Sequence, residues 1–261
     1  MVFDYKITPK KTFFNYKITN QKEISGMGET KTVKLLKEEG NVYFDYSVKT
    51  PHNDLMAFMF IIIFNPFIKE ELTFKFPISI YFVKNLRKVN KFRNINIIDT
   101  EIIKGNPFKG KNISIPIGGG IDSSAIMCLF KDTYLYHSLG KEKVNVNLLA
   151  EKCGCKKKVD IIDSNIKQFI KPHIFTHWIT VFIGAYLSAQ DQNIGFLFLG
   201  TQLETSGYIK NNKFNNTDVF KNEYRTLSKN IGVELINVFN GCSSIINSKI
   251  ICKKNVDNYI T

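Results

Sequence analysis

In the first 110 residues, apolar side chains alternate with polar ones in three short stretches, at residues 2–8, 12–19 and 41–48. A period of two places the apolar side chains on one face of a strand, so each stretch predicts a half-buried β-strand. Helices are predicted at residues 54–65 and 78–90, with a further strand at residues 72–76. We therefore expect residues 1–110 to form a small α+β module, with a role as scaffold or in substrate recognition.

After residue 110 the pattern changes to strands that alternate with helices. The predicted strands cover residues 112–117, 133–137, 159–162, 195–199 and 234–239. The predicted helices cover residues 123–130, 146–153, 176–190 and 219–230. Strands separated by helices favour a parallel sheet with right-handed crossovers and helices on both faces. The predicted fold class is α/β, a doubly wound five-stranded parallel sheet over residues 111–261, preceded by the α+β module.

The stretch ISIPIGGGIDSSAIMCLF, residues 113–130, carries the clearest chemistry. Three glycines, Gly118, Gly119 and Gly120, follow an apolar strand and lack the Cβ that would keep a ligand away from the backbone. Asp122, Ser123 and Ser124 come next and are typical residues at the start of a helix. The N-terminus of a helix attracts anions, so this loop is predicted to bind phosphate. A glycine-rich turn that binds no ligand is the alternative.

Two familiar phosphate loops do not fit this stretch. A Walker loop needs Gly-Lys followed by Ser or Thr, and no lysine lies in or directly after the loop. The dinucleotide fingerprint needs a glycine where Ser123 stands. The residues resemble instead the PP-loop, Ser-Gly-Gly-x-Asp-Ser, of the ATP pyrophosphatases, also called adenine nucleotide α-hydrolases. Only the first position differs, because Gly118 replaces the serine.

The resemblance implies a fold, cofactors and a reaction. Members of this superfamily cleave ATP between the α and β phosphates, usually adenylating a substrate and releasing pyrophosphate. It implies that Gly118, Gly119, Gly120, Ser123 and Ser124 bind ATP phosphates. Asp122 and Ser123 would be catalytic, and Asp122 would also hold Mg²⁺. The layout, with a module before the loop, is similar to that of the UDP-N-acetylmuramoyl dipeptide glutamate epimerases and of queuosine-precursor synthase-like proteins. Such relatives often end in a cysteine-rich segment, and this chain has only Cys242 and Cys252 there, so the resemblance implies either a C-terminally shortened member or a fragment.

The ends of the other strands are predicted to line the same crevice. In open parallel sheets, ligands bind beyond the carboxyl ends of the strands, at the point where the strand order reverses. The resemblance implies that His137, Ser138, Gly200 and Thr201 bind ATP at these strand ends and that Glu204 lies near the substrate. Ser243, after the fifth strand, is predicted for the substrate from its position. Each is a residue type that also ends strands in ordinary loops.

Three other groups carry weaker signals. His173 and His177 are spaced four apart, as helical metal ligands can be, but no acidic residue or third histidine accompanies them, so capping or packing is favoured. Cys153 and Cys155 lack a second cysteine pair, which argues against zinc and leaves a redox or sulfur-carrying role as the alternative. Arg225 is expected on a solvated helix face.

The amino-acid composition limits the class of protein to which the chain can belong. The 261 residues are 44% hydrophobic, enough for a sizeable core, and the longest apolar run, residues 55–64, is too short to span a bilayer. Five cysteines without framework spacing indicate reduced thiols in a cytoplasmic protein. The net charge of +13 permits binding to nucleic acid.

The sequence therefore predicts an ATP-dependent adenylating enzyme that activates a carboxylate or carbonyl of a small-molecule or nucleotide-linked acidic substrate. The first alternative is a nucleotide-binding or regulatory module without turnover. The second is a base-modifying or defence-related PP-loop enzyme that acts on nucleic acid.

Overall fold

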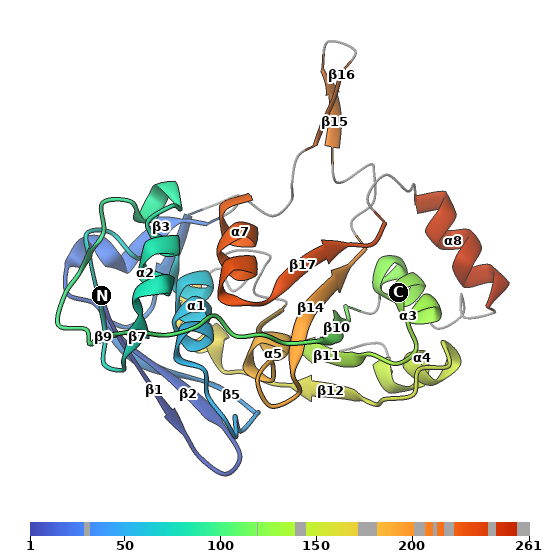
Figure 1. Ribbon diagram of the computed structural model, residues 1–261, viewed down its shortest axis with the longest axis horizontal. Helices are drawn as coiled ribbons and strands as arrows, with labels where there is room; N and C mark the ends of the chain where they lie inside the picture. Colours follow the sequence, from blue (N-terminus) through green and yellow to red (C-terminus); the bar gives the residue numbers. More distant parts are fainter. Residues whose placement is uncertain are drawn as a thin grey trace.

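A computed structural model describes residues 1–28, 32–118, 120–138, 145–171, 182–200, 207–210, 213–216, 222–239 and 244–254 of the chain. It contains a mixed sheet built by the N-terminal residues and a parallel sheet built by the C-terminal residues, with helix α1 (Asn53–Phe64) between them (Figure 1). The predicted boundary near residue 110 falls in the connection between the last N-terminal strand and the first strand of the parallel sheet.

The N-terminal sheet has five strands in the order β5-β2-β1-β6-β8. Their bounds are Val2–Ile7 for β1, Thr12–Lys17 for β2, Glu39–Phe44 for β5, Glu71–Phe74 for β6 and Asn96–Ile97 for β8. Strand β1 pairs antiparallel with β2 and parallel with β6. The period-two stretches and the strand at 72–76 are thus confirmed as strands. The short strands of two smaller sheets were not predicted: β3 (Ser25–Met27), β4 (Thr32–Leu35), β7 (Ile78–Ser79), β9 (Ile102–Ile103) and β13 (Ile170–Lys171).

Helix α1 confirms the helix expected at residues 54–65, and every residue from Asp54 to Phe64 in it is buried. The helix predicted at residues 78–90 is wrong at both ends. Residues 78 and 79 form β7, helix α2 spans only Ile80–Leu86, and a 3-10 turn, η2, follows at Asn90–Phe92. Ser79 explains the later start, because its hydroxyl accepts a hydrogen bond from the Phe82 amide and donates one to the buried Asp54 carboxylate.

The C-terminal sheet is parallel throughout and has the order β12-β11-β10-β14-β17. The bounds are Asn112–Pro116 for β10, Tyr134–Ser138 for β11, Val159–Ile162 for β12, Ile194–Leu199 for β14 and Glu234–Asn237 for β17. All five predicted strands are confirmed. When the five strands are numbered along the chain, their order across the sheet is 3-2-1-4-5. The direction in which successive strands are added therefore reverses between β10 and β14.

Helices lie on both faces of this sheet. One face packs against α3 (Ile121–Leu129), α4 (Val146–Lys152) and α8 (Ser244–Lys253). The other packs against α5 (Ile183–Leu187) and α7 (Asn222–Ile231), and its core continues into α1 and the N-terminal sheet. Of the helix predicted at 176–190, residues 176–181 lie outside the described part. A hairpin of β15 (Gly207–Lys210) and β16 (Lys213–Asn216) was not predicted. No described helix has the length and apolar character needed to cross a membrane.

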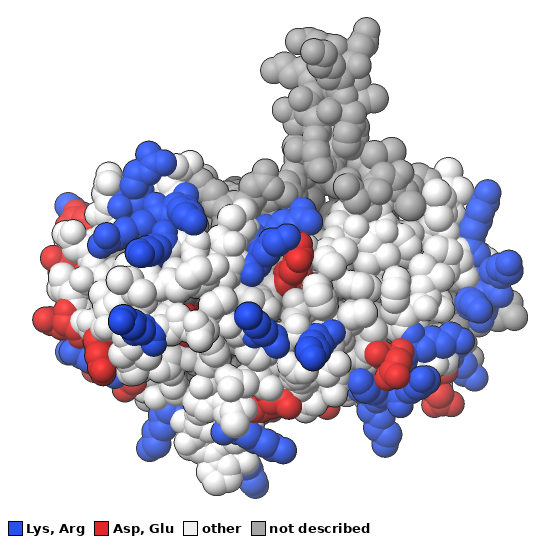
Figure 2. Space-filling model, viewed as in Figure 1, with Lys and Arg blue, Asp and Glu red and all other residues white. Residues whose placement is uncertain are grey.

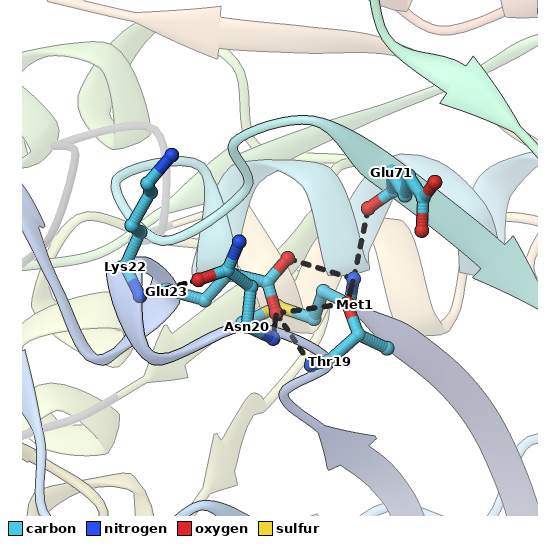
Figure 3. Close-up of polar contacts among 6 residues, drawn as sticks. All are labelled: Met1, Thr19, Asn20, Lys22, Glu23 and Glu71. Carbon is cyan, nitrogen blue, oxygen red and sulfur yellow. Dashed lines mark hydrogen bonds and ion pairs between the residues drawn. The ribbon is translucent and has the colours of Figure 1, made fainter.

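The first residue is held inside the N-terminal sheet. The Met1 ammonium forms an ion pair with Glu23 Oε1 at 2.7 Å and donates hydrogen bonds to Thr19 Oγ1 and the Glu71 carbonyl (Figure 3). Met1 and Glu23 are both buried. The other Glu23 oxygen accepts a hydrogen bond from the Thr19 amide at 2.7 Å, so this buried carboxylate has partners at both oxygens. A buried charge is tolerated when it is paired and hydrogen-bonded in this way.

Candidate functional site

The glycine loop lies between β10 and α3, at the carboxyl end of the central strand. Gly118 is exposed, and a Cβ built on Gly118 or Gly120 would meet no atom within 4 Å. These two glycines are therefore not required by packing inside the protein. They leave open space beside the backbone, as a loop that receives a ligand would. Gly119 lies outside the described residues.

Helix α3 begins two residues earlier than predicted. Its N-cap is Gly120, in an extended conformation, and no side chain caps the first turn. Asp122, Ser123 and Ser124 are therefore inside the helix, and the expectation that they start it is corrected. A glycine N-cap has no side chain with which to satisfy the first amides of the helix, so these amides and the positive end of the helix dipole face the loop.

The two serines of the loop turn toward the same carbonyl. Ser123 Oγ donates to the Gly120 carbonyl at 3.2 Å and Ser124 Oγ donates to it at 2.8 Å. Ser123 is half-buried, whereas Ser124 is fully buried. In this structure Ser124 holds the shape of the loop from inside, and Ser123 is the serine whose hydroxyl can rotate toward a ligand.

Asp122 lies where three elements meet. Its Oδ1 accepts a hydrogen bond of 2.8 Å from the amide of Asn247 on α8. Gly200, directly after β14, packs so closely against it that an added Cβ would lie 2.9 Å from Asp122 Cβ and 3.0 Å from the Asp122 carbonyl oxygen. The predicted neighbourhood of Gly200 and the glycine loop is thus present. A side chain at position 200 would push Asp122 out of place.

Asn247 is a site residue that the sequence analysis missed. It is completely buried, and among the described residues its Oδ1 has no hydrogen-bond partner. Because Asn247 and the buried Ile251 are four residues apart, they share the inner face of α8. No local pattern marks Asn247, because its neighbours on the inner side of α8 include Ser244 and Ser248, whereas the apolar Ile245 and Ile246 of the same helix are exposed.

His137 connects the second strand to the loop. Its Nδ1 lies 2.6 Å from the carbonyl oxygen of Ile117, the residue before Gly118. A carbonyl only accepts hydrogen bonds, so Nδ1 carries the proton. The side chain is buried, and the Ile117 amide donates to the Tyr136 carbonyl at 2.8 Å. His137 therefore fixes the backbone at the residue that precedes the glycine loop. Ser138 follows it at the end of β11, and its side chain is not described.

The remaining predicted site residues are distributed as follows. Thr201, Glu204 and Ser243 lie outside the described residues, and so do His173 and His177. Arg225 is half-buried on α7. Among the described residues no group of three or more His, Cys, Asp or Glu side chains is arranged to hold a metal ion.

The cysteines behind α3 form contacts that the sequence did not indicate. Cys153 Sγ lies 3.3 Å from Cys128 Sγ on α3, and the four described cysteines are all free thiols. The hydrogen bond with Cys128, together with burial, raises the pKa of Cys153, and burial raises the pKa of Cys155 to about 11. Both thiols stay protonated near neutral pH, which favours packing over the redox or sulfur-carrying role considered for this pair.

Comparison of the chain with protein-family models, with curated proteins and with solved structures finds no significant match.

Proposed function

We propose that the chain is a PP-loop ATP pyrophosphatase with the adenine nucleotide α-hydrolase fold, which adenylates its substrate. The observation that carries this proposal is the position of the segment formed by Gly118 and residues 120–122. It lies at the carboxyl end of the first strand of a parallel sheet whose order reverses beside that strand. Ligand sites of open α/β sheets form at this point. The sequence of residues 118–124 also resembles the PP-loop, with Gly118 in place of its serine.

The phosphates of ATP would bind over the start of α3. The uncapped first amides and the open space beside Gly118 and Gly120 suit a polyanion. Ser123 would turn its hydroxyl from the Gly120 carbonyl to a phosphate oxygen. Ser124, His137 and Gly200 would act by keeping the loop and Asp122 in place, because their contacts are directed at those parts of the protein.

Asp122 fits a magnesium ion that arrives with ATP. Mg²⁺ is commonly bound by one or two carboxylates together with substrate phosphates, and it does not need a cage of protein ligands. When bound, the ion would neutralise charge on the leaving pyrophosphate. Asn247 would hold the Asp122 carboxylate in place through its hydrogen bond to Asp122 Oδ1.

The reaction would proceed by attack on the α phosphorus. A carboxylate or carbonyl oxygen of the substrate would form the new P–O bond, while the bond from the α phosphorus to the bridging oxygen breaks. The electron pair would leave with pyrophosphate, and the adenylated substrate would remain. A carboxylate needs no deprotonation at neutral pH, so catalysis would rest on positioning and on charge stabilisation by the loop amides.

A second candidate is a nucleotide-binding module without turnover. It is favoured by two observations, namely that Gly118 lacks the serine hydroxyl of the PP-loop and that both loop serines donate to the protein's own Gly120 carbonyl. Such a module would bind ATP at the same place and release no product.

The test is release of AMP and pyrophosphate from ATP and Mg²⁺ by the purified protein, with a panel of carboxylate substrates. Asp122→Ala and Ser123→Ala should abolish release. Asp132→Ala and Ser248→Ala are the matched controls and should leave it unchanged. Asp132 is an exposed carboxylate paired with Lys156, and Ser248 Oγ donates to the Ser244 carbonyl at 2.9 Å, one turn earlier in its own helix.

The outcomes separate the two candidates. ATP binding that is lost in Asp122→Ala, with no AMP from any substrate mixture, would establish the binding module. Absence of ATP binding to the wild-type protein would refute both. Loss of activity in the control variants as well would show that the site lies elsewhere.

A further inference from the structure

We infer that the exposed basic side chains of residues 84–93 bind the phosphate backbone of double-stranded nucleic acid. This surface, here called the α2 patch, consists of Lys84, Arg87, Lys88 and Arg93. All four are exposed. Figure 2 shows Lys and Arg side chains gathered over α2 and the 3-10 turn that follows it. The inference does not depend on the proposed ATP chemistry.

The α2 patch lacks acidic partners. The sequence contains no Asp or Glu between Glu71 and Asp99. Among the described residues, no carboxylate lies within ion-pair distance of Lys84, Arg87, Lys88 or Arg93. Two of these side chains donate to neutral oxygens: Lys88 Nζ to Asn85 Oδ1 at 3.0 Å, and Arg93 to Asn90 Oδ1 at 3.1 Å. Among the described residues, these neutral partners leave the positive charge of the patch uncompensated.

A second lysine cluster shows the opposite arrangement. Lys156, Lys157 and Lys158 are the most conspicuous basic run in the sequence, yet Lys156 and Lys157 both pair with Asp132, at 3.2 and 3.6 Å. Lys157 Nζ also lies 3.5 Å from the centre of the Tyr134 ring. Part of the positive charge in this run is neutralised by ion pairs within the protein, whereas the charge of the α2 patch remains available to a partner.

The framework beneath the patch is fixed. Leu86, Val89 and Phe92 are each 1% exposed, so every third residue anchors the segment in the core and the basic residues between them face solvent. The buried Asn85 also accepts a hydrogen bond of 2.9 Å from Asn230 on α7. Cations at the end of α2 stabilise its C-terminal carbonyls, but this accounts only for charges in the last turn. Arg93 lies beyond the end of the helix.

The chemistry of the surface favours a duplex over other polyanions. Binding in a membrane interface needs several exposed apolar or aromatic side chains beside the basic ones. The exposed large hydrophobic residue of α2 is Ile80, at its first position, and no other such residue lies in residues 80–93. Single strands are held mainly by stacking of bases on aromatic rings, and the one aromatic of the segment, Phe92, is buried. A rigid row of cations without such groups matches the regular phosphates of a duplex, read without sequence preference.

The test compares two triple variants of the full chain. Lys84→Gln, Arg87→Gln and Lys88→Gln neutralise part of the α2 patch. Lys152→Gln, Lys156→Gln and Lys158→Gln remove the same charge from two exposed lysines of the other cluster and from the exposed Lys152 at the end of α4. Binding to a labelled 20-base-pair DNA duplex and to the matching RNA duplex is followed by fluorescence anisotropy between 50 and 300 mM salt. Thermal unfolding confirms that both variants fold, and vesicles with and without phosphatidylserine serve as the alternative polyanion.

The patch variant should weaken duplex binding at least tenfold near 100 mM salt. It should also reduce the slope of log K against log salt by about three, since each lost phosphate contact removes about one from that slope. The control variant should weaken binding less than threefold. The inference fails if both triples weaken binding equally, if the wild-type protein binds neither duplex at 50 mM salt, or if the patch variant loses only vesicle binding.

Discussion

The hydrophobic cores on the two faces of the parallel sheet differ in size and in residue type. On the face toward the N-terminal module the core is large and aromatic, and Phe60 of α1 packs against Phe3 and Phe14 with ring centres 4.5 Å apart in both pairs. On the opposite face the core is smaller and mainly aliphatic, with residues such as Ile115, Ile126 and Leu149 between the sheet and its helices. The candidate site lies on the side of the smaller core, at the start of α3.

This difference assigns most of the folding stability to one face of the sheet and the candidate ligand site to the other. The aromatic core joins α1 to α5, the helix that packs on the parallel sheet, for example through Phe58 and Tyr186, whose ring centres lie 5.0 Å apart. On the other face, single polar contacts fix the site, chiefly that between Asp122 and Asn247. Changes in the aromatic core should therefore unfold the protein, whereas changes at the start of α3 should alter binding with a smaller loss of stability.

The largest effect is expected for Phe60→Ala. Its side chain is fully buried and stacked, and truncation of such a residue costs about 3–5 kcal/mol of unfolding free energy. Urea denaturation followed by circular dichroism measures the loss. Ile126→Ala in the smaller core is the matched comparison and should cost less than Phe60→Ala. An equal or larger loss for Ile126→Ala would contradict the division between the two faces.

A pair of glycine substitutions should separate binding from folding. Gly200→Ala places a methyl group 2.9 Å from Asp122 Cβ, so it should cost about 1–3 kcal/mol of stability and weaken ATP binding as well. Gly120→Ala meets only open space and loses a favoured N-cap, so it should cost no more than about 1 kcal/mol while ATP binding falls. Calorimetry with ATP and Mg²⁺ and thermal unfolding give the two readouts. Unchanged ATP affinity in Gly120→Ala would argue that the loop does not hold phosphate.

Replacement of Asn247 should give a smaller loss. Asn247→Leu keeps the volume of the side chain and removes its hydrogen bond to the Asp122 carboxylate. A hydrogen bond to a charged acceptor contributes about 1.5–3 kcal/mol. Part of this loss is offset because the substitution also removes Asn247 Oδ1, which has no partner among the described residues. The net loss of unfolding free energy should be about 1 kcal/mol. Mg²⁺-dependent ATP binding should weaken, whereas binding in the absence of Mg²⁺ should not. An equal effect with and without Mg²⁺ would show that Asn247 does not act through Asp122.

The smallest effect concerns alkaline pH. Burial raises the pKa of Tyr16 in the aromatic core to about 12, whereas an unfolded chain titrates near its ordinary value of 10. A raised folded-state pKa means that the contribution of Tyr16 to stability is complete below pH 10 and is lost as the pH rises from 10 to 12. Tyr16→Phe should therefore flatten the fall in unfolding free energy over that interval. An unchanged slope would contradict a protonated, buried Tyr16.

The sequence predicted the parallel sheet well because its five strands are short apolar runs whose patterns stand out locally. It missed β3, β4 and the β7–β9 pair, which are two to four residues long and are defined by their partners rather than by their own periodicity. The start of α3 was placed too late because Asp122 and Ser123 are stronger N-cap residues than Gly120. Asn247 is 125 residues from Asp122 in the chain, and no local pattern relates the two.

The most direct test of the account is a crystal structure of the protein with Mg²⁺ and α,β-methylene ATP, an analogue that cannot be cleaved at the reacting bond. The account predicts phosphate oxygens within hydrogen-bond distance of the first amides of α3 and of the Ser123 hydroxyl, with the metal on Asp122. Triphosphate bound elsewhere, with Ser123 still donating to the Gly120 carbonyl and Asp122 without metal, would contradict it.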